Sequence, residues 1–289
     1  MDSTQTNAPA EGMNAELLNR FRQELVVAGY SQRTIKMYLC YVSKFLETLK
    51  RPVESCARED IISFIAAKKE GGNASNATLA LALAALKFFF HNFLKLKIID
   101  EIKPPKKAKK LPTVLTKDEV RELINATKAK RNRLIVEFLY SSGCRVSECI
   151  KLRLNDLDLR EKIARVKGGK GNKDRIIILS KEWIKHLKTC LRHRKVPSEY
   201  VFTLKNGKPL SADTVQRIVR NAAKTAGITK KVTPHTMRHS YATHLLDAGE
   251  NIRKIQELLG HSNLSTTQIY TAVSTEELKK VKSPFDRLK

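Results

Sequence analysis

The chain has 289 residues, enough for about two domains that each bury their own core. Lysine and arginine number 55 against 29 aspartate and glutamate residues, and the resulting net charge of +26 favours nucleic acid as a partner. No basic amphipathic terminal helix indicates a membrane surface, and no apolar run approaches the ~18 residues of a membrane span. The first residues lack the pattern of a signal peptide, so we expect no membrane association and a cytoplasmic protein.

The N-terminal part of the chain is predicted to form a domain of four helices over residues 14–99, after a disordered terminus at 1–13. Apolar residues repeat there at helical spacing. Gly29 is placed to end the first helix, and Ser31 to cap the second. The fourth helix is expected at about residues 76–94. Its aromatic and leucine stripes are typical of a core, and we find no catalytic cluster in this domain.

Residues 100–112 are predicted to be a basic linker. The stretch Lys-Pro-Pro-Lys-Lys-Ala-Lys-Lys-Leu-Pro combines prolines, which favour extended backbone, with five lysines that keep it solvated. It is either a spacer or a segment that also contacts phosphates, and composition alone does not separate the two.

The second predicted domain, residues 113–273, consists mainly of helices with a small hairpin. Thr116 opens it with a capping box, and Gly143 ends its second helix. Two β-prone runs flank a glycine-rich turn that carries Lys170 near its tip. The expected elements are helices near 117–126, 131–142, 181–194 and 212–226, strands at 162–166 and 175–179, a possible strand at 201–204, and helical structure from Pro234 onward.

Several polar side chains of this domain could act together on a phosphate. Arg145 and Arg238 stay charged and can donate bidentate hydrogen bonds to phosphate oxygens. His235 lies three residues before Arg238, so a helix would present both on one face. The phenol of Tyr270, with an ordinary pKa of about 10, needs cationic neighbours to become a nucleophile.

Each of these residues also has a structural interpretation when it is taken alone. Lys170 is then a charge at a hairpin tip, and His239 and His244 satisfy local hydrogen bonds. His235 and His239 have the spacing of a zinc-binding helix, but Thr236 stands where a metalloprotease needs glutamate and Arg238 would repel a cation. The glycine turn also lacks the spacing of a nucleotide-binding loop. We therefore predict neither a metal nor another cofactor.

The order of the motifs supports a joint function. Gly-Cys-Arg-Val-Ser-Glu, Gly-Lys-Gly-Asn-Lys-Asp-Arg, His-x-x-Arg, Leu-Gly-His and a tyrosine nine residues later resemble the signature of tyrosine recombinases. The stretch Leu-Leu-Gly-His-Ser-Asn-Leu-Ser-Thr-Thr-Gln-Ile-Tyr is similar to the Xer-type branch, which resolves chromosome dimers. The resemblance covers about residues 14–281. The six positions that it identifies as catalytic are Arg145, Lys170, His235, Arg238, His261 and Tyr270.

This resemblance implies a core-binding domain and a mostly helical catalytic domain with a small antiparallel sheet, acting on double-stranded DNA. Tyr270 would attack the scissile phosphate and form a 3′-phosphotyrosyl link, while the two arginines and His261 hold the phosphate. Lys170 would protonate the leaving 5′-oxygen, and His235 would accept a proton or bind the phosphate. The covalent link conserves bond energy, so neither metal nor ATP is required.

The tail at residues 274–289 is expected to dock on a neighbouring protomer in a tetramer on synapsed DNA, or to fold back on its own domain. Pro284 interrupts its apolar helical spacing and leaves both arrangements open. Two alternative functions also stay open: an integrase of a virus or mobile element, and a DNA-binding protein without catalysis.

Overall fold

The structure is a computed structural model that describes residues 8–49, 51–71, 74–105, 111–167 and 174–260, with side chains from residue 14 onward. Contacts between residues divide the chain into two compact units, Met1–Lys109 and Lys110–Lys289, and each is described by itself. The division falls within the lysine-rich stretch expected to be a linker. Among the described residues, no helix has the length and apolarity needed to cross a membrane.

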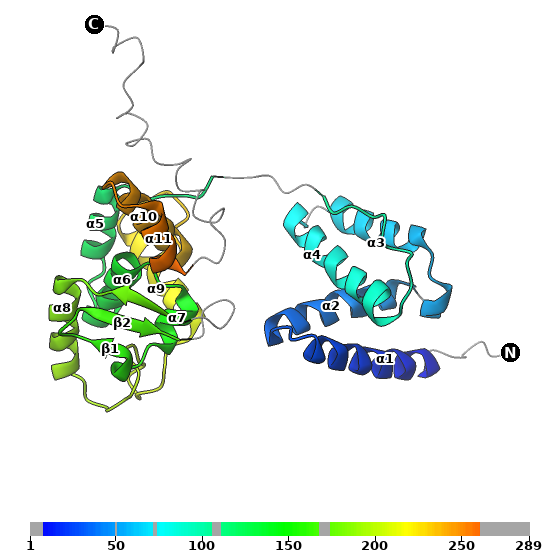
Figure 1. Cartoon of the computed structure of the whole chain (residues 1–289), viewed down its shortest axis with the longest axis horizontal. Coiled ribbons are helices and arrows are strands. Elements are labelled where there is room, and N and C mark those ends of the chain that lie inside the picture. Colours follow the sequence, from blue (N-terminus) through cyan, green and yellow to red (C-terminus); the bar gives the residue numbers. More distant parts are fainter. Residues whose placement is uncertain (1–7, 50, 72–73, 106–110, 168–173, 261–289) are drawn as a thin grey trace, which may run out of the picture. The chain divides into compact units, whose positions relative to one another are not determined.

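The first unit is a helical bundle (Figure 1). Its core contains several aromatic side chains. Helix α2 packs against both α1 and α4. Gly29, in the left-handed region with φ +74°, follows α1, and the Ser31 hydroxyl accepts a hydrogen bond from the Thr34 N–H at 3.2 Å. The predicted stop and cap are therefore confirmed. The elements are α1 (Ala8–Val27), α2 (Gln32–Leu49), η1 (Val53–Ser55), α3 (Arg58–Glu70), α4 (Asn76–Lys87) and the π-helix η2 (Phe88–Phe93).

Two features of this unit differ from the prediction. Helix α1 begins at Ala8, inside the terminus expected to be disordered, because Pro9 fits the first turn of a helix. The fourth helix does not continue as an α-helix to residue 94 but becomes η2 after Lys87. The wider π turn accompanies full burial of the successive rings of Phe89 and Phe90, which lie 5.1 Å from the ring of Phe21 and 5.6 Å from that of Phe45, respectively.

The second unit places helices around a three-stranded antiparallel sheet of order β1-β2-β3 (Figure 1). Ala164 pairs with Ile177 in the register, and both are buried, so this face of the sheet belongs to the core. Helix α6 packs against α5, α8, α9, α10 and β3. The elements are α5 (Lys117–Ala126), α6 (Lys130–Ser142), α7 (Val146–Lys151), η3 (Leu154–Asp156), β1 (Leu157–Asp158), β2 (Ile163–Val166), β3 (Arg175–Ile178), α8 (Lys181–Arg192), α9 (Ala212–Thr225), α10 (Pro234–Asp247) and α11 (Ile252–Leu259).

The predicted mostly helical fold with a small sheet is confirmed, and local signals account for many of its boundaries. The Thr116 hydroxyl accepts from the Glu119 N–H at 3.1 Å, as the capping box predicts. Trp183, the single tryptophan, is buried against Phe138 with ring centroids 5.0 Å apart. The possible strand at 201–204 forms only an isolated bridge between Thr203 and Pro209. The two-residue strand β1 and the short helix α7 were not predicted.

Candidate active site

The connection from α6 to α7 presents Arg145. Gly143 follows α6 in the left-handed region with φ +61°, and Arg145 stands immediately before the first residue of α7. A Cβ atom at Gly143 would lie 2.4 Å from the ring carbon Cδ1 of buried Tyr241. This close approach, together with the positive φ, requires glycine at the turn.

Glu148 binds Arg145 through both backbone and side chain. The Arg145 N–H donates to Glu148 Oε2 at 2.7 Å, and its Nη1 donates to Oε1 at 2.9 Å. Arg145 Nη2 donates to the carbonyl of Gly260 at 3.3 Å. Burial alone would raise the pKa of Glu148, but hydrogen bonds and charge from Arg175 and Arg145 outweigh it and lower this pKa to about 2. Glu148 is therefore ionised, and at 9% exposure it is a buried charge that holds Arg145 in place.

Arg238 is held inside the protein by main-chain carbonyls. It lies in the second turn of α10, whose start is capped by the Thr233 hydroxyl and carries Pro234 as its first residue. Only 3% of Arg238 is exposed. Its Nη1 donates to Gly143 O and its Nη2 to Leu259 O, both at 2.6 Å. Because Arg238 and Arg145 bind the carbonyls of consecutive residues, the end of α11 brings the two guanidinium groups together.

His235 lies one turn before Arg238 on the same helix, as the spacing predicts. Its side chain stays exposed to solvent, yet partial desolvation and the charges of Arg238 and Arg145 lower its pKa below the ordinary 6.5. The imidazole is then neutral at pH 7 and able to accept a proton. His239, more deeply placed, has its pKa lowered to about 4 by burial and by His235 and Arg238. His244 shares a 2.8 Å hydrogen bond with the Tyr140 hydroxyl, a contact of the kind that its structural interpretation predicts.

Three of the six predicted catalytic residues are thus brought together: Arg145, His235 and Arg238. The other three, Lys170, His261 and Tyr270, lie outside the described residues. Of the residues directly next to these three in sequence, only Gly260 is among the described residues. The expected hairpin around Lys170 is present as the antiparallel pair β2 and β3. Gly260, the residue before His261, accepts a hydrogen bond from Arg145.

The prediction missed one cation of this cluster, Arg175. Its Nη1 and Nη2 each donate to a different oxygen of Glu148 at 2.7 Å, and its Nε donates to Leu258 O at 2.9 Å. A signal for it was present in the sequence. Residues 175 and 177 of a strand face the same side, and Ile177 belongs to the core, so the alternation of β3 directs Arg175 inward, where a charge needs a partner.

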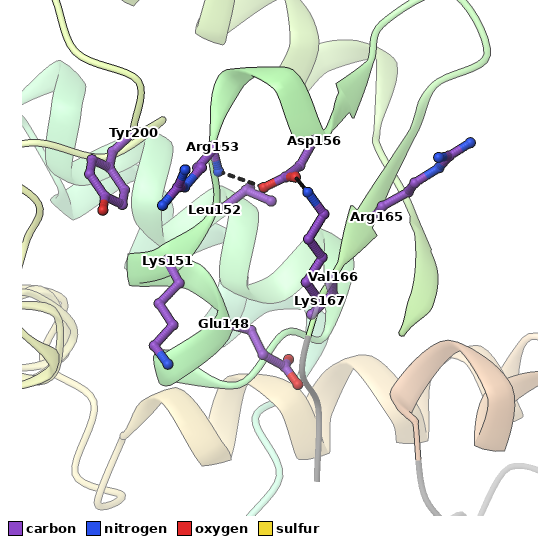
Figure 2. Close-up of a pocket in the computed structure, with 9 residues that line it drawn as sticks. All are labelled: Glu148, Lys151, Leu152, Arg153, Asp156, Arg165, Val166, Lys167 and Tyr200. Carbon is purple, nitrogen blue, oxygen red and sulfur yellow. Dashed lines mark hydrogen bonds and ion pairs between the residues drawn. The ribbon is translucent and has the colours of Figure 1, made fainter. Parts of the chain in front are cut away.

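A basic cavity of about 490 Å³ adjoins Glu148 on the side of α7 and β2. Figure 2 shows Asp156 between Arg153 and Lys167, with Arg165 pointing away from the others. Asp156 accepts from the Arg153 N–H and pairs with Lys167 Nζ, both at 3.0 Å. Lys151 and Arg165 have no carboxylate partner in the part of the chain that the structure describes. A lining of this kind suits phosphate groups better than an apolar ligand.

The cluster as a whole carries a positive charge in partly buried surroundings. Arg145 and Arg175 pair with the carboxylate of Glu148, and Arg238 binds main-chain carbonyls, so the three guanidinium groups and one carboxylate leave a net charge of +2 beside a neutral imidazole. Fixed guanidinium groups complement the charge of a phosphodiester and the larger charge of its pentacovalent transition state. The arrangement is suited to phosphoryl transfer.

The comparisons with known proteins agree with this chemistry. Residues 113–277 match the phage integrase family, and residues 17–100 match the N-terminal SAM-like domain of phage integrases. The chain belongs to the phage integrase family. This member is 41% identical over 272 residues to tyrosine recombinase XerA of Pyrococcus horikoshii, covering 93% of both chains. It is also 36% identical over 294 residues to tyrosine recombinase XerD of Listeria innocua, covering 93% of this chain and 98% of the relative.

Solved structures of integrase-family relatives share the fold. The crystal structure of XerA recombinase matches with a TM-score of 0.56 and 34% identity, over 93% of this chain and 100% of that one. The pre-cleavage complex of XerH site-specific recombinase with its difH substrate matches with a TM-score of 0.69 and 26% identity, over 86% of this chain and 78% of that one. Both relatives are site-specific or Xer recombinases, as the sequence motifs suggested.

Proposed function

We propose that this integrase-family chain is a site-specific tyrosine recombinase that cuts and rejoins duplex DNA through a 3′-phosphotyrosyl intermediate. One observation carries the proposal: Arg145 and Arg238 converge on the end of α11 beside a neutral His235, a charge arrangement suited to a phosphodiester. Similarity to tyrosine recombinases over more than nine-tenths of the chain supports it.

The proposed cleavage step uses the six predicted residues. The Tyr270 hydroxyl oxygen attacks the scissile phosphorus, and its proton passes to His235. The new bond joins phosphorus to the tyrosine oxygen, and the bond from phosphorus to the 5′-oxygen breaks. Lys170 gives a proton to that 5′-oxygen, because an alkoxide is a poor leaving group without a general acid. Rejoining reverses each transfer, with the 5′-hydroxyl of the exchanged strand as the nucleophile.

Phosphate binding in this scheme falls to Arg145, Arg238 and His261. The two guanidinium groups would contact the non-bridging oxygens, where negative charge grows in the transition state. Carbonyl and carboxylate contacts already fix both guanidinium groups in the structure, so little reorganisation is needed when DNA binds. No step of this scheme requires a metal ion or ATP.

The biological setting that we propose is the resolution of chromosome dimers by a cytoplasmic, nucleoid-associated protein. The whole-chain similarity to Xer-named recombinases supports this setting over a mobile-element integrase. The protein would act as a homo-tetramer on synapsed DNA, with the tail at residues 274–289 docking between protomers. The net charge of +26 supports DNA as the partner, and binding should weaken steeply with salt.

Covalent trapping tests the proposal. The protein is incubated with sheared genomic DNA from its source organism, quenched in detergent, and the protein-linked DNA ends are sequenced. We expect fragments that converge on one short site in the chromosome and that disappear with Tyr270→Phe. Ends at mobile-element junctions would favour the integrase function. Tight, salt-sensitive binding with no covalent product, or an equal yield from Tyr270→Phe, would refute the proposed chemistry.

A further inference from the structure

Arg175 takes no part in the cleavage scheme, although it is among the most constrained charges of the second unit. Only 8% of its side chain is exposed. All three nitrogens of its guanidinium group donate hydrogen bonds, two of them to Glu148 and one to Leu258 O. A charge so enclosed is costly unless its contacts have a definite geometry. These three hydrogen bonds of Arg175 have two consequences for the site.

The first consequence concerns the orientation of Glu148. This carboxylate receives four hydrogen bonds, two from Arg175 and two from Arg145. The contact with Arg175 is bidentate, with both distances at 2.7 Å, and such a contact fixes the plane of the carboxylate. Without Arg175, Glu148 would be held only by Arg145, the residue that it has to orient. The side chain of Arg145 is also more exposed than that of Arg175, 23% against 8%.

The second consequence concerns the end of α11. Arg175 Nε holds the carbonyl of Leu258 at 2.9 Å, and the stem of Arg175 packs against Gly260. A Cβ atom at Gly260 would lie only 2.7 Å from Arg175 Cδ, so the glycine allows this approach. The next carbonyls along the chain, those of Leu259 and Gly260, bind Arg238 and Arg145. One side chain from β3 therefore joins α7 to the end of α11.

We propose that Arg175 is a positioning residue for DNA strand cleavage: it sets the orientation in which Glu148 and the end of α11 hold the guanidinium groups of Arg145 and Arg238 against the scissile phosphate. The inference rests on the proposed function. It adds a residue from β3 to a site whose other described members come from the α6–α7 connection, from α7, from α10 and from the end of α11.

Two simpler roles make different predictions. If Arg175 served only as a positive charge near the DNA, Arg175→Lys would keep that role. If it served only the fold, its loss would lower stability without changing the rate of the folded protein. A positioning role requires the bidentate geometry, which lysine cannot reproduce. Arg175→Lys and Arg175→Gln should then both be slow while folded and bound to DNA.

The experiment measures single-turnover formation of the covalent complex on a synthetic duplex of the trapped site, nicked beside the scissile phosphate so that cleavage is irreversible. Trp183 fluorescence shows whether each variant is folded at the assay temperature, and gel shift gives its affinity for the same duplex. Arg160→Gln is the matched control, because it removes one charge from an exposed position between β1 and β2. We expect Arg175→Gln and Arg175→Lys to be about 10- to 100-fold slower, with the affinity for DNA and the control rate unchanged.

Coupling to Glu148 provides a readout that a purely structural role would not change. If Arg175 acts through Glu148, the double variant Glu148→Gln with Arg175→Gln should be no slower than the slower single variant. The double variant removes the buried charges of Glu148 and Arg175 together and leaves neither of these two without its partner. It can therefore be compared with the unsubstituted protein if Arg175→Gln alone does not fold. Additive losses would overturn the proposal.

A duplex with sulfur in place of the 5′-bridging oxygen of the scissile phosphate distinguishes an effect on phosphate binding by Arg145 and Arg238 from an effect on proton donation by Lys170. The sulfur leaves as a thiolate and needs no general acid. We expect the variants to stay slow on this substrate, because charge on the phosphate still has to be stabilised. Restoration of the wild-type rate would show that Arg175 acts on the leaving group, and a wild-type rate on the ordinary duplex would show no role in cleavage. Either result would overturn the inference. No covalent product from the unsubstituted protein would refute the proposed function itself, and this inference with it.

Discussion

Replacement of Gly143 by alanine tests how the turn before Arg145 is built. Two costs are expected. The positive φ of 61° places an alanine in the left-handed region, which costs about 1–2 kcal/mol. Its Cβ would also lie 2.4 Å from Tyr241 Cδ1 and 3.0 Å from Leu259 Cδ2. Both side chains are buried in one small cluster with Ile255, so relief of the overlap should cost about 1–3 kcal/mol more.

Gly227→Ala is the matched control. Gly227 also has a positive φ, +69°, but nothing lies within 4 Å of a Cβ placed there. The free energy of unfolding of this variant should therefore fall only by the cost of placing alanine in the left-handed region. The difference in the free energy of unfolding between the two variants therefore measures the cost of the overlap with Tyr241 and Leu259. In a domain of this size, each kcal/mol of that cost lowers Tm by about 2–4 °C.

The assay is thermal unfolding followed by tryptophan fluorescence. Trp183 is the single tryptophan of the chain and is buried in the second unit, so its signal reports this unit alone. The same variants are then tested for covalent complex formation. Gly143→Ala should slow the reaction, because the carbonyl of residue 143 holds Arg238 at 2.6 Å, whereas Gly227→Ala should not. Equal stability of the two variants would refute the reasoning, since Tyr241 would then move aside at no cost.

Two further predictions concern groups around the same cluster. The pKa of Glu148 is lowered to about 2 from an ordinary 4.5, so the stability that this carboxylate contributes is present above pH 4.5 and is lost as pH falls from 4.5 towards 2. The loss should reach roughly 3 kcal/mol in urea unfolding monitored at Trp183, and Glu148→Gln should lack this part of the pH dependence. Tyr140→Phe removes the hydrogen bond to His244 and should cost about 0.5–1.5 kcal/mol in the same measurement, with the cleavage rate unchanged. A slower cleavage rate would instead assign His244 a role in the reaction.

Much of the architecture is readable from local sequence because its causes are local. The Thr116 hydroxyl caps a helix only three residues away, and Gly143 ends one through its own backbone conformation. The β-prone runs of β2 and β3 on either side of a glycine-rich turn predict a hairpin. Elements that depend on tertiary packing or on a very short pairing were missed. The π-helix η2 accompanies the packing of its rings against Phe21 and Phe45, and β1 consists of two residues paired with β2.

The candidate site divides in the same way. The sequence by itself predicted which side chains carry the chemistry, including Lys170, His261 and Tyr270, because motif order and spacing, and the family resemblance that they carry, are properties of the chain. It also placed His235 and Arg238 on one helix face. Only the tertiary structure decided which charges pair. Glu148 lies buried between Arg145 and Arg175, and Arg175 comes 27 residues after Glu148 in the sequence. Such a pairing depends on tertiary contacts, among them the packing of β3 against α11, which no local pattern encodes.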